Sequence, residues 1–248
     1  MKRKKIEDYF EKSKKNSPKR EESSDSSNED SKNAVGGNVE ESVKVCQDPQ
    51  WTTIDKNNLK VDYAIIFDRS VSKHIFDSLE KEISYFTGEL TKIKVFGKVY
   101  PIPRQQSAYG DSGVKYKYSG TTVPALPWTH TLEEIRDILE EIVGVKYNFV
   151  LVNRYKDGND KMGDHKDDEK EIDQSAPIAS LTFGAERDFV FKHQDKTKLD
   201  LENVKIVLKD GMLLLMKHPT NTYWYHGLPP RKSCLDPRIN LTFRKIKN

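Results

Sequence analysis

The stretch "YNFVLVNRY", residues 147–155, is a short, strongly apolar run that ends in polar residues, which is typical of a buried β-strand. Other short runs with the same β-rich composition are separated by Gly, Asp or Asn turns. They are "VDYAIIF" (61–67), "IKVF" (93–96), "KVYPIP" (98–103), "IASLTF" (178–183), "RDFVFKH" (187–193), "VKIVLK" (204–209), "MLLLMK" (212–217) and "INLTFRK" (239–245). Many short strands in one domain predict an antiparallel, two-sheet arrangement.

Two segments have helical periodicity instead. After residue 67, Ser70 is the predicted N-cap of a helix in which Ile75, Leu79 and Ile83 recur at helical spacing, and residues 131–143 show the same period. The predicted fold is therefore mostly β with flanking helices: a jelly roll, or double-stranded β-helix, with the helices on one side. Folds of this kind carry small binding sites in their mouths.

Composition limits the function classes. The 248 residues suffice for one domain and a tail, and we predict a disordered tail at 1–50 and a folded domain at 51–248. With a net charge of +3, any nucleic-acid contact must come from local basic clusters. Cys46 and Cys234 show no CxxC spacing, which favours free thiols in an intracellular protein. No apolar run is long enough to span a membrane.

The N-terminal segment "MKRKKIEDYF" combines basic residues with an apolar pattern. Ile6, Tyr9 and Phe10 would share one face of a helical turn, as in a peptide that anchors in a partner's groove. The pattern is similar to the motif that binds the replication sliding clamp, although Arg3 stands where that motif has glutamine. The basic residues fit either nuclear import or ordinary solvated charge.

The segment "GDHKDDEKE", residues 163–171, raises the possibility of a metal site. A histidine followed two residues later by an acid occurs here as His165 and Asp167, and again as His193 and Asp195. The second pair sits at a predicted hairpin end, where both side chains would face water. The first pair follows the most hydrophobic strand and a glycine-containing loop. A site with two histidines and one carboxylate suits Fe(II) but needs a second histidine, and either His218 or His226 could supply it.

The segment "PRINLTFRK" supplies positive charge. Because side chains alternate along a strand, Arg238 and Arg244 share one face with Asn240 and Thr242. Two buried guanidiniums would require an anion, and a carboxylate fits best. The alternative is a surface strand whose basic residues face outward.

Together, "NFVLVNRYKDG", "GDHKDDE", "PIASLTFGAERDFVFKH", "HPTNTYWYHGLP" and "PRINLTFRK" resemble the AlkB family of Fe(II)- and 2-oxoglutarate-dependent nucleic-acid demethylases, nearest its branch that repairs duplex DNA. The resemblance spans residues 51–247. It implies a dioxygenase jelly roll with a nucleotide-recognition lid. It makes His165, Asp167 and His226 the iron ligands. The 2-oxoglutarate pocket would be formed by Asn153, Tyr155, Arg238 and Arg244.

The implied reaction is oxidative removal of N-alkyl groups from 1-methyladenine and 3-methylcytosine in double-stranded DNA, using dioxygen and releasing succinate and formaldehyde. Asp168 and Glu169 would contact the cationic base. The base must be flipped out, and Phe96, at a hairpin tip, would fill its place in the stack.

The resemblance also assigns residues around the flipped base. Tyr118, with Tyr116 beside it, would stack on the damaged base, and Arg104 would contact the opposing strand. Phosphates would be held by basic residues, namely Lys192, Arg231 and Lys232. We expect a nuclear monomer. The alternatives are an RNA or single-stranded-DNA demethylase of the same family, and an inactive nucleic-acid-binding module.

Overall fold

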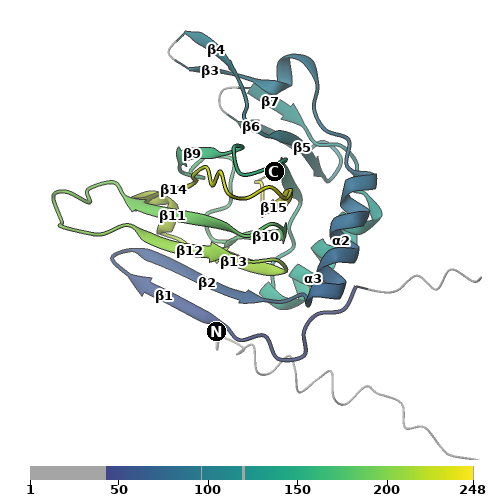
Figure 1. Ribbon diagram of the computed structural model, residues 1–248, viewed down its shortest axis with the longest axis horizontal. Helices are drawn as coiled ribbons and strands as arrows, with labels where there is room; N and C mark the ends of the chain where they lie inside the picture. Colours follow the sequence, from purple (N-terminus) through teal and green to yellow (C-terminus); the bar gives the residue numbers. More distant parts are fainter. Residues whose placement is uncertain (1–42, 96, 119–120, 248) are drawn as a thin grey trace, which may run out of the picture. The chain divides into compact units, whose positions relative to one another are not determined.

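The computed structural model describes residues 43–95, 97–118 and 121–247. In the compact unit Lys44–Asn248, two antiparallel sheets face each other (Figure 1). The larger sheet has the order β1(Thr52–Lys56), β2(Leu59–Ile65), β13(Met212–Met216), β10(Ile178–Gly184), β15(Arg238–Arg244), β8(Phe149–Tyr155), β5(Gln105–Gly110). The smaller has the order β12(Val204–Leu208), β11(Arg187–His193), β14(Trp224–Leu228), β9(Met162–His165). The predicted jelly roll is confirmed.

Strand β15 lies near the middle of the larger sheet, and every one of its residues is buried. Ile239, Leu241 and Phe243 alternate with polar residues, and Phe243 packs against the ring of Trp128 at 6.2 Å. The polar residues of β15 face the space between the sheets. The alternative of a surface strand with outward basic residues is therefore wrong, because both faces of the strand are covered.

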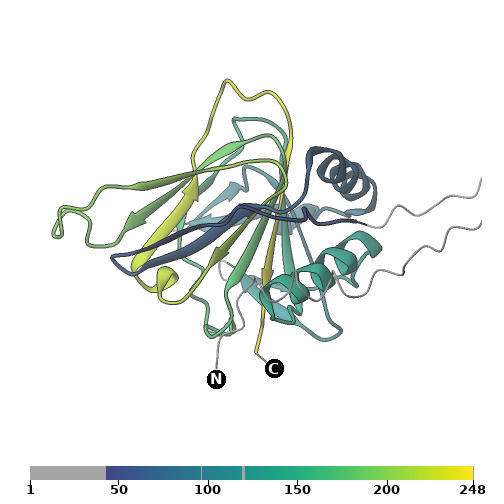
Figure 2. The same ribbon diagram turned by 90° about the horizontal axis from the view of Figure 1, so that it is seen from below.

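Two helices, α2(Arg69–Glu82) and α3(His130–Val143), pack against each other, and α2 contacts β10 (Figure 2). Ile75 and Leu79 of α2 are fully buried, as their spacing predicts. The predicted N-cap was wrong by two residues. The carboxylate of Asp68 accepts hydrogen bonds from the backbone N–H groups of Ser70 and Val71, because Asp68 has the extended backbone that a capping residue needs.

Smaller elements complete the unit. A helical turn, η1(Gly88–Thr91), leads into the hairpin β3(Lys92–Val95) and β4(Lys98–Pro101); a second hairpin is β6(Lys115–Tyr118) and β7(Thr121–Pro124), and α4(Thr220–Tyr223) precedes β14. Figure 1 shows the β3–β4 hairpin projecting beyond the two sheets. No helix within the described ranges is long and apolar enough to cross a membrane.

The sequence did not predict the edge strand β1. Its residues, "TTIDK", are mostly exposed and lack an apolar run, so the pattern that identified the predicted strands is absent. The sequence also did not predict β5, β6, β7, β9 and β14. The turn that pairs β1 with β2 consists of Asn57 and Asn58, both with positive φ, as a two-residue hairpin turn requires.

Candidate functional site

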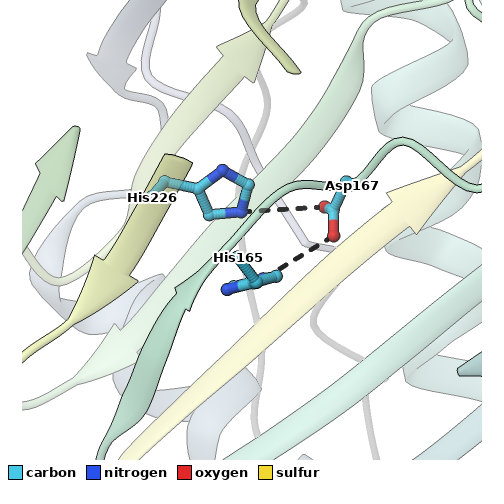
Figure 3. Close-up of side chains that lie close together, drawn as sticks. All are labelled: His165, Asp167 and His226. Carbon is cyan, nitrogen blue, oxygen red and sulfur yellow. Dashed lines mark ion pairs between the residues drawn. The ribbon is translucent and has the colours of Figure 1, made fainter. Parts of the chain in front are cut away.

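His165, Asp167 and His226 come together between the sheets, each offering a ligand atom within 4.8 Å of the others (Figure 3). His165 ends β9 and Asp167 follows it. His226 is on β14, whose pairing with β9 places it directly opposite His165. The Asp167 carboxylate lies 3.7 Å from Nε2 of His165 and 4.0 Å from Nε2 of His226. Sheet pairing thus joins ligands that are about sixty residues apart in the chain.

The protonation states of these groups suit a cation. Burial alone would raise the pKa of Asp167, but the combined influence of Arg244, His226 and His165, including the hydrogen bond from Arg244, outweighs it and lowers the pKa to about 2. Burial lowers the pKa of His226 to about 3. His165 places Nδ1 2.9 Å from the carbonyl of Gly163, which can only accept, so Nδ1 is the donor and Nε2 is the nitrogen on the side of Asp167. An ionised carboxylate and neutral imidazoles are the forms that bind metals.

The donor set fits a divalent iron. Non-haem Fe(II) sites typically use two imidazole nitrogens and one carboxylate oxygen. These three ligands occupy one face of the ion and leave its other coordination positions open. Asp167 Oδ1 is buried and has no hydrogen-bond partner in the part of the chain that the structure describes. A buried, unsatisfied carboxylate oxygen is costly unless something binds it, and a metal ion would satisfy it.

The other two histidines considered from the sequence lie elsewhere. His218 is exposed. His193 does not face water as predicted: it is buried, and its ring stacks on Tyr223 and meets Trp224 edge-on at 5.1 Å. Its Nδ1 accepts a hydrogen bond from the backbone of Asp195, which is exposed. The prediction failed for His193 because the residues of α4 and β14 cover the hairpin end.

A pocket beside the triad is lined by the four residues expected to hold the keto acid. Arg238, Arg244, Asn153 and Tyr155 all line it together with His165, Asp167 and His226. Strand pairing explains this, because Arg238 is opposite Tyr155 and Asn240 is opposite Asn153 in the β15–β8 register. Residues opposite each other share a face of the sheet.

Arg238 and Arg244 differ in their partners. Arg244 donates to Asp167 Oδ2 at 2.8 Å. Arg238 is only 2% exposed, donates to the hydroxyl of Thr182, and lies 5.1 Å from the centre of the Tyr155 ring. Burial lowers the pKa of Arg238 to about 10. Among the described residues no carboxylate is paired with it, so this end of the pocket is suited to an anion from solution.

The side chain of Asn153 is held by two residues that do not line the pocket. Its Oδ1 accepts hydrogen bonds from Arg104 at 2.7 Å and from Gln106 at 2.9 Å. Sequence reasoning missed Gln106. No local sequence signal identified it, because its role comes from the pairing of β5 with β8, which places it opposite Asn153.

Arg187 was also missed. It is almost fully buried and donates to the carbonyls of Asp157, Asp160 and Pro229, thereby joining the loops next to β9 and β14.

The residues expected to contact DNA are only partly described. Asp168 is exposed next to Asp167, and Glu169 is half-buried. Lys192 is ion-paired with Asp164 at 2.6 Å, and Arg231 and Lys232 are exposed in the loop after β14. Tyr116 and Tyr118 belong to β6, but their side chains, like Phe96 and the segment with Ile6, Tyr9 and Phe10, lie outside what the structure describes.

Comparisons with known proteins agree with this geometry. The model of the 2OG-Fe(II) oxygenase superfamily matches residues 65–244. The DNA oxidative demethylase ALKBH2 of Homo sapiens is 50% identical over 202 residues, covering 80% of this chain and 77% of the relative. The Mus musculus alpha-ketoglutarate-dependent dioxygenase alkB homolog 3 is 35% identical over 153 residues, covering 59% and 53%.

A solved structure described as "The structure of OsALKBH1" matches 78% of this chain and all of that chain, with a TM-score of 0.54 and 14% identity, which supports the fold. The family match extends over most of the folded unit, and the human ALKBH2 relative is 50% identical over 80% of this chain. The chain therefore belongs to the 2OG-Fe(II) oxygenase superfamily, and within it to the AlkB family.

Proposed function

We propose that this chain is a DNA oxidative demethylase that removes N-alkyl groups, such as those of 1-methyladenine and 3-methylcytosine, from double-stranded DNA. The observation that carries the proposal is a single pocket in which the three candidate iron ligands lie beside a buried guanidinium. The choice of DNA rests on the 50% identity to ALKBH2 proteins, compared with 35% over a shorter region for alkB homolog 3.

In the proposed reaction, His165, Asp167 and His226 would hold Fe(II) through one imidazole nitrogen from each histidine and a carboxylate oxygen. Iron held there would supply the oxidising chemistry, in which dioxygen and 2-oxoglutarate give carbon dioxide and succinate while the N-methyl group gains an oxygen and leaves as formaldehyde. Arg238 binds the distal carboxylate of the keto acid, since it is the buried guanidinium that lines the pocket and has no acidic partner among the described residues. Arg244 keeps Asp167 ionised and oriented.

The base is held on the open side of the site. The exposed carboxylate of Asp168 and the half-buried Glu169 follow directly after Asp167, where they favour a methylated base that carries positive charge. Tyr116 and Tyr118, on the β6–β7 hairpin, stack on that base as part of the nucleotide-recognition lid. The basic residues Lys192, Arg231 and Lys232 contribute phosphate contacts.

Duplex preference is assigned to the β3–β4 hairpin. Its strands pair up to Val95 and Lys98, and Gly97 has a positive φ. Phe96 lies between the two strands in the sequence. An apolar side chain at such a tip can enter the stack where the flipped base was. Val99 and Tyr100 are exposed on β4, so the hairpin already presents apolar surface.

The deciding experiment measures succinate and formaldehyde released from matched duplex and single-stranded DNA and from RNA, each with one 1-methyladenine. Methyl-dependent release that is fastest on the duplex is expected. Phe96→Ala should slow repair of the duplex more than repair of the single strand, and Ile65→Ala, which truncates an exposed apolar residue of β2, should change neither. Faster turnover of RNA or single strands would favour the alternative demethylase, and no turnover would favour the inactive module.

We also propose that the N-terminal segment binds the replication sliding clamp through Ile6, Tyr9 and Phe10, that the protein is nuclear, and that it is a monomer. Apolar residues at this spacing fit a groove on a partner, and the basic residues around them fit an import signal. Titration calorimetry with purified clamp should show binding that Phe10→Ala abolishes. Imaging of the tagged chain and light scattering of the pure protein test the other two points.

A further inference from the structure

The orientation of the Asn153 side chain is determined by its neighbours. Asn153 is completely buried on β8 and lines the pocket. Its Oδ1 receives hydrogen bonds from Nε of Arg104 and from Nε2 of Gln106, the residue directly opposite it on β5. A guanidinium can only donate, so the Asn153 atom that it contacts must be the oxygen. The amide nitrogen must then point away from both donors.

That nitrogen lacks a hydrogen-bond acceptor among the described residues. It is Nδ2 of Asn153, which is buried. Buried donors in folded proteins are almost always paired, and an unpaired one at the wall of a pocket marks where a ligand acceptor belongs. A carboxylate or keto oxygen of 2-oxoglutarate is such an acceptor, and the positive charge on Arg104 strengthens the N–H donor through the shared amide.

We infer that Arg104 and Gln106 are positioning residues for the cosubstrate: together they lock the Asn153 amide so that its N–H group donates to 2-oxoglutarate. This inference rests on the proposed function for the identity of the ligand. It gives Arg104 a task inside the protein, in place of the contact with the opposing DNA strand that the family resemblance implies.

The surroundings of Arg104 extend the argument. Arg104 also donates to the carbonyl of Lys161 at 3.4 Å, and the N–H of Lys161 donates to the carbonyl of Pro103. Residues 102–104 connect the β3–β4 hairpin to β5, and Lys161 directly precedes β9, which carries His165. The same arginine therefore links the hairpin segment, the strand with the first histidine and the keto-acid pocket.

Three variants and a matched control test the inference. Gln106→Met removes the donor and keeps the length of the side chain, Arg104→Met removes the guanidinium and keeps an apolar stem, and Arg104→Lys keeps a donor. Gln105→Met is the control, because Gln105 is the exposed neighbour that accepts from Arg154 and does not touch Asn153. Binding of 2-oxoglutarate to Mn(II)-loaded protein is measured by calorimetry, and duplex binding is measured by fluorescence anisotropy without keto acid.

We expect Gln106→Met and Arg104→Met each to weaken 2-oxoglutarate binding about tenfold, the scale of one buried hydrogen bond. Arg104→Lys should recover part of the loss, and Gln105→Met should bind normally. KM for 2-oxoglutarate should rise while kcat at saturating keto acid is unchanged, and duplex affinity should stay the same. In an Asn153→Ala background the Gln106 and Arg104 substitutions should have no further effect, because they act through Asn153.

Unchanged keto-acid affinity in Gln106→Met would overturn the inference, as would losses that persist undiminished in the Asn153→Ala background. If Arg104→Met lowers only the affinity for duplex DNA, then Arg104 contacts the opposing strand and does not position the cosubstrate. If Asn153→Ala does not fold, the comparison of Gln106→Met with Gln105→Met decides by itself. Wild-type protein that binds no 2-oxoglutarate would refute the proposed function, a result distinct from equal binding by wild type and variants.

Discussion

Arg244 donates a 2.8 Å hydrogen bond to Oδ2 of Asp167, and both residues are 2% exposed. This buried pair leaves the second carboxylate oxygen, Oδ1, free of hydrogen bonds within the described ranges and closest to Nε2 of His165. The arginine on β15 thus orients the carboxylate and keeps it charged. A residue counted from sequence as part of the cosubstrate pocket also supports the metal ligand next to it.

Replacing Arg244 should therefore weaken metal binding before any cosubstrate is added. Arg244→Gln removes the charge that holds down the pKa of Asp167. We expect Mn(II) affinity to fall about 10- to 100-fold, as is usual when a partner of a metal ligand is lost. Calorimetry without 2-oxoglutarate measures this and separates it from any effect on the keto acid. Unaltered Mn(II) affinity would mean that Asp167 is oriented by other contacts.

The two histidines that the sequence left as alternatives can be compared directly. His226→Ala removes an imidazole whose Nε2 lies 4.0 Å from Asp167, whereas His218→Ala alters an exposed side chain outside the site. His226→Ala should abolish Mn(II) binding and reduce demethylation by at least about 100-fold, a loss of roughly 3 kcal/mol of transition-state stabilisation. His218→Ala should match wild type in both assays. A strong effect of His218→Ala on metal binding would reject the triad.

How far the sequence could predict the site depended on strand periodicity. Alternation along β15 correctly placed Arg238 and Arg244 on one face, because that property is local to the strand. The choice between His218 and His226 could not be made this way. It depends on the pairing of β14 with β9, a contact between segments about sixty residues apart, and no local pattern encodes it. Only the family resemblance indicated His226, the histidine that the structure brings to His165 and Asp167.

Other errors have local physical causes. His193 was expected in water because it ends a strand, but Tyr223 and Trp224, brought by α4 and β14, bury it. Asp68 capped the first helix instead of Ser70, since either residue type can serve and only the backbone conformation decides. Gln106 had no recognisable motif. Its role arises from the β5–β8 register, which places it opposite Asn153.

Two nearly fully buried arginines should respond oppositely to substitution. Arg187 donates to three backbone carbonyls, whereas Arg238 has no acidic partner among the described residues. Arg187→Met leaves those carbonyls unsatisfied and should reduce the free energy of unfolding by about 2–4 kcal/mol. Arg238→Met removes a buried charge, so the free protein should be no less stable, while 2-oxoglutarate affinity falls about 100-fold.

Denaturant unfolding and calorimetry with the keto acid measure the two quantities for both arginine variants. The expected pattern is a stability loss in Arg187→Met and a binding loss in Arg238→Met. If Arg238→Met unfolds more easily than wild type yet binds 2-oxoglutarate normally, then Arg238 is a structural residue and the anion is held elsewhere.

Gly158 allows a test of the loop that precedes β9. Its N–H donates to the carbonyl of Cys234 and its carbonyl accepts from the N–H of Arg231, both at 2.8 Å. A Cβ at this position would lie 1.8 Å from the Arg231 carbonyl oxygen, so the two loops could not approach as they do. Gly158→Ala should therefore cost about 1–3 kcal/mol, the usual penalty of forced overpacking, and lower Tm by several degrees.

Gly163→Ala is the matched control, because a Cβ there meets nothing within 4 Å and Gly163 is not among the glycines with positive φ. Scanning calorimetry of both variants measures the difference. We expect Gly163→Ala to melt close to wild type and Gly158→Ala clearly below it. Equal melting temperatures would show that the loop at Gly158 yields at little cost, and that the close approach to Arg231 does not help to hold the segment that carries His165.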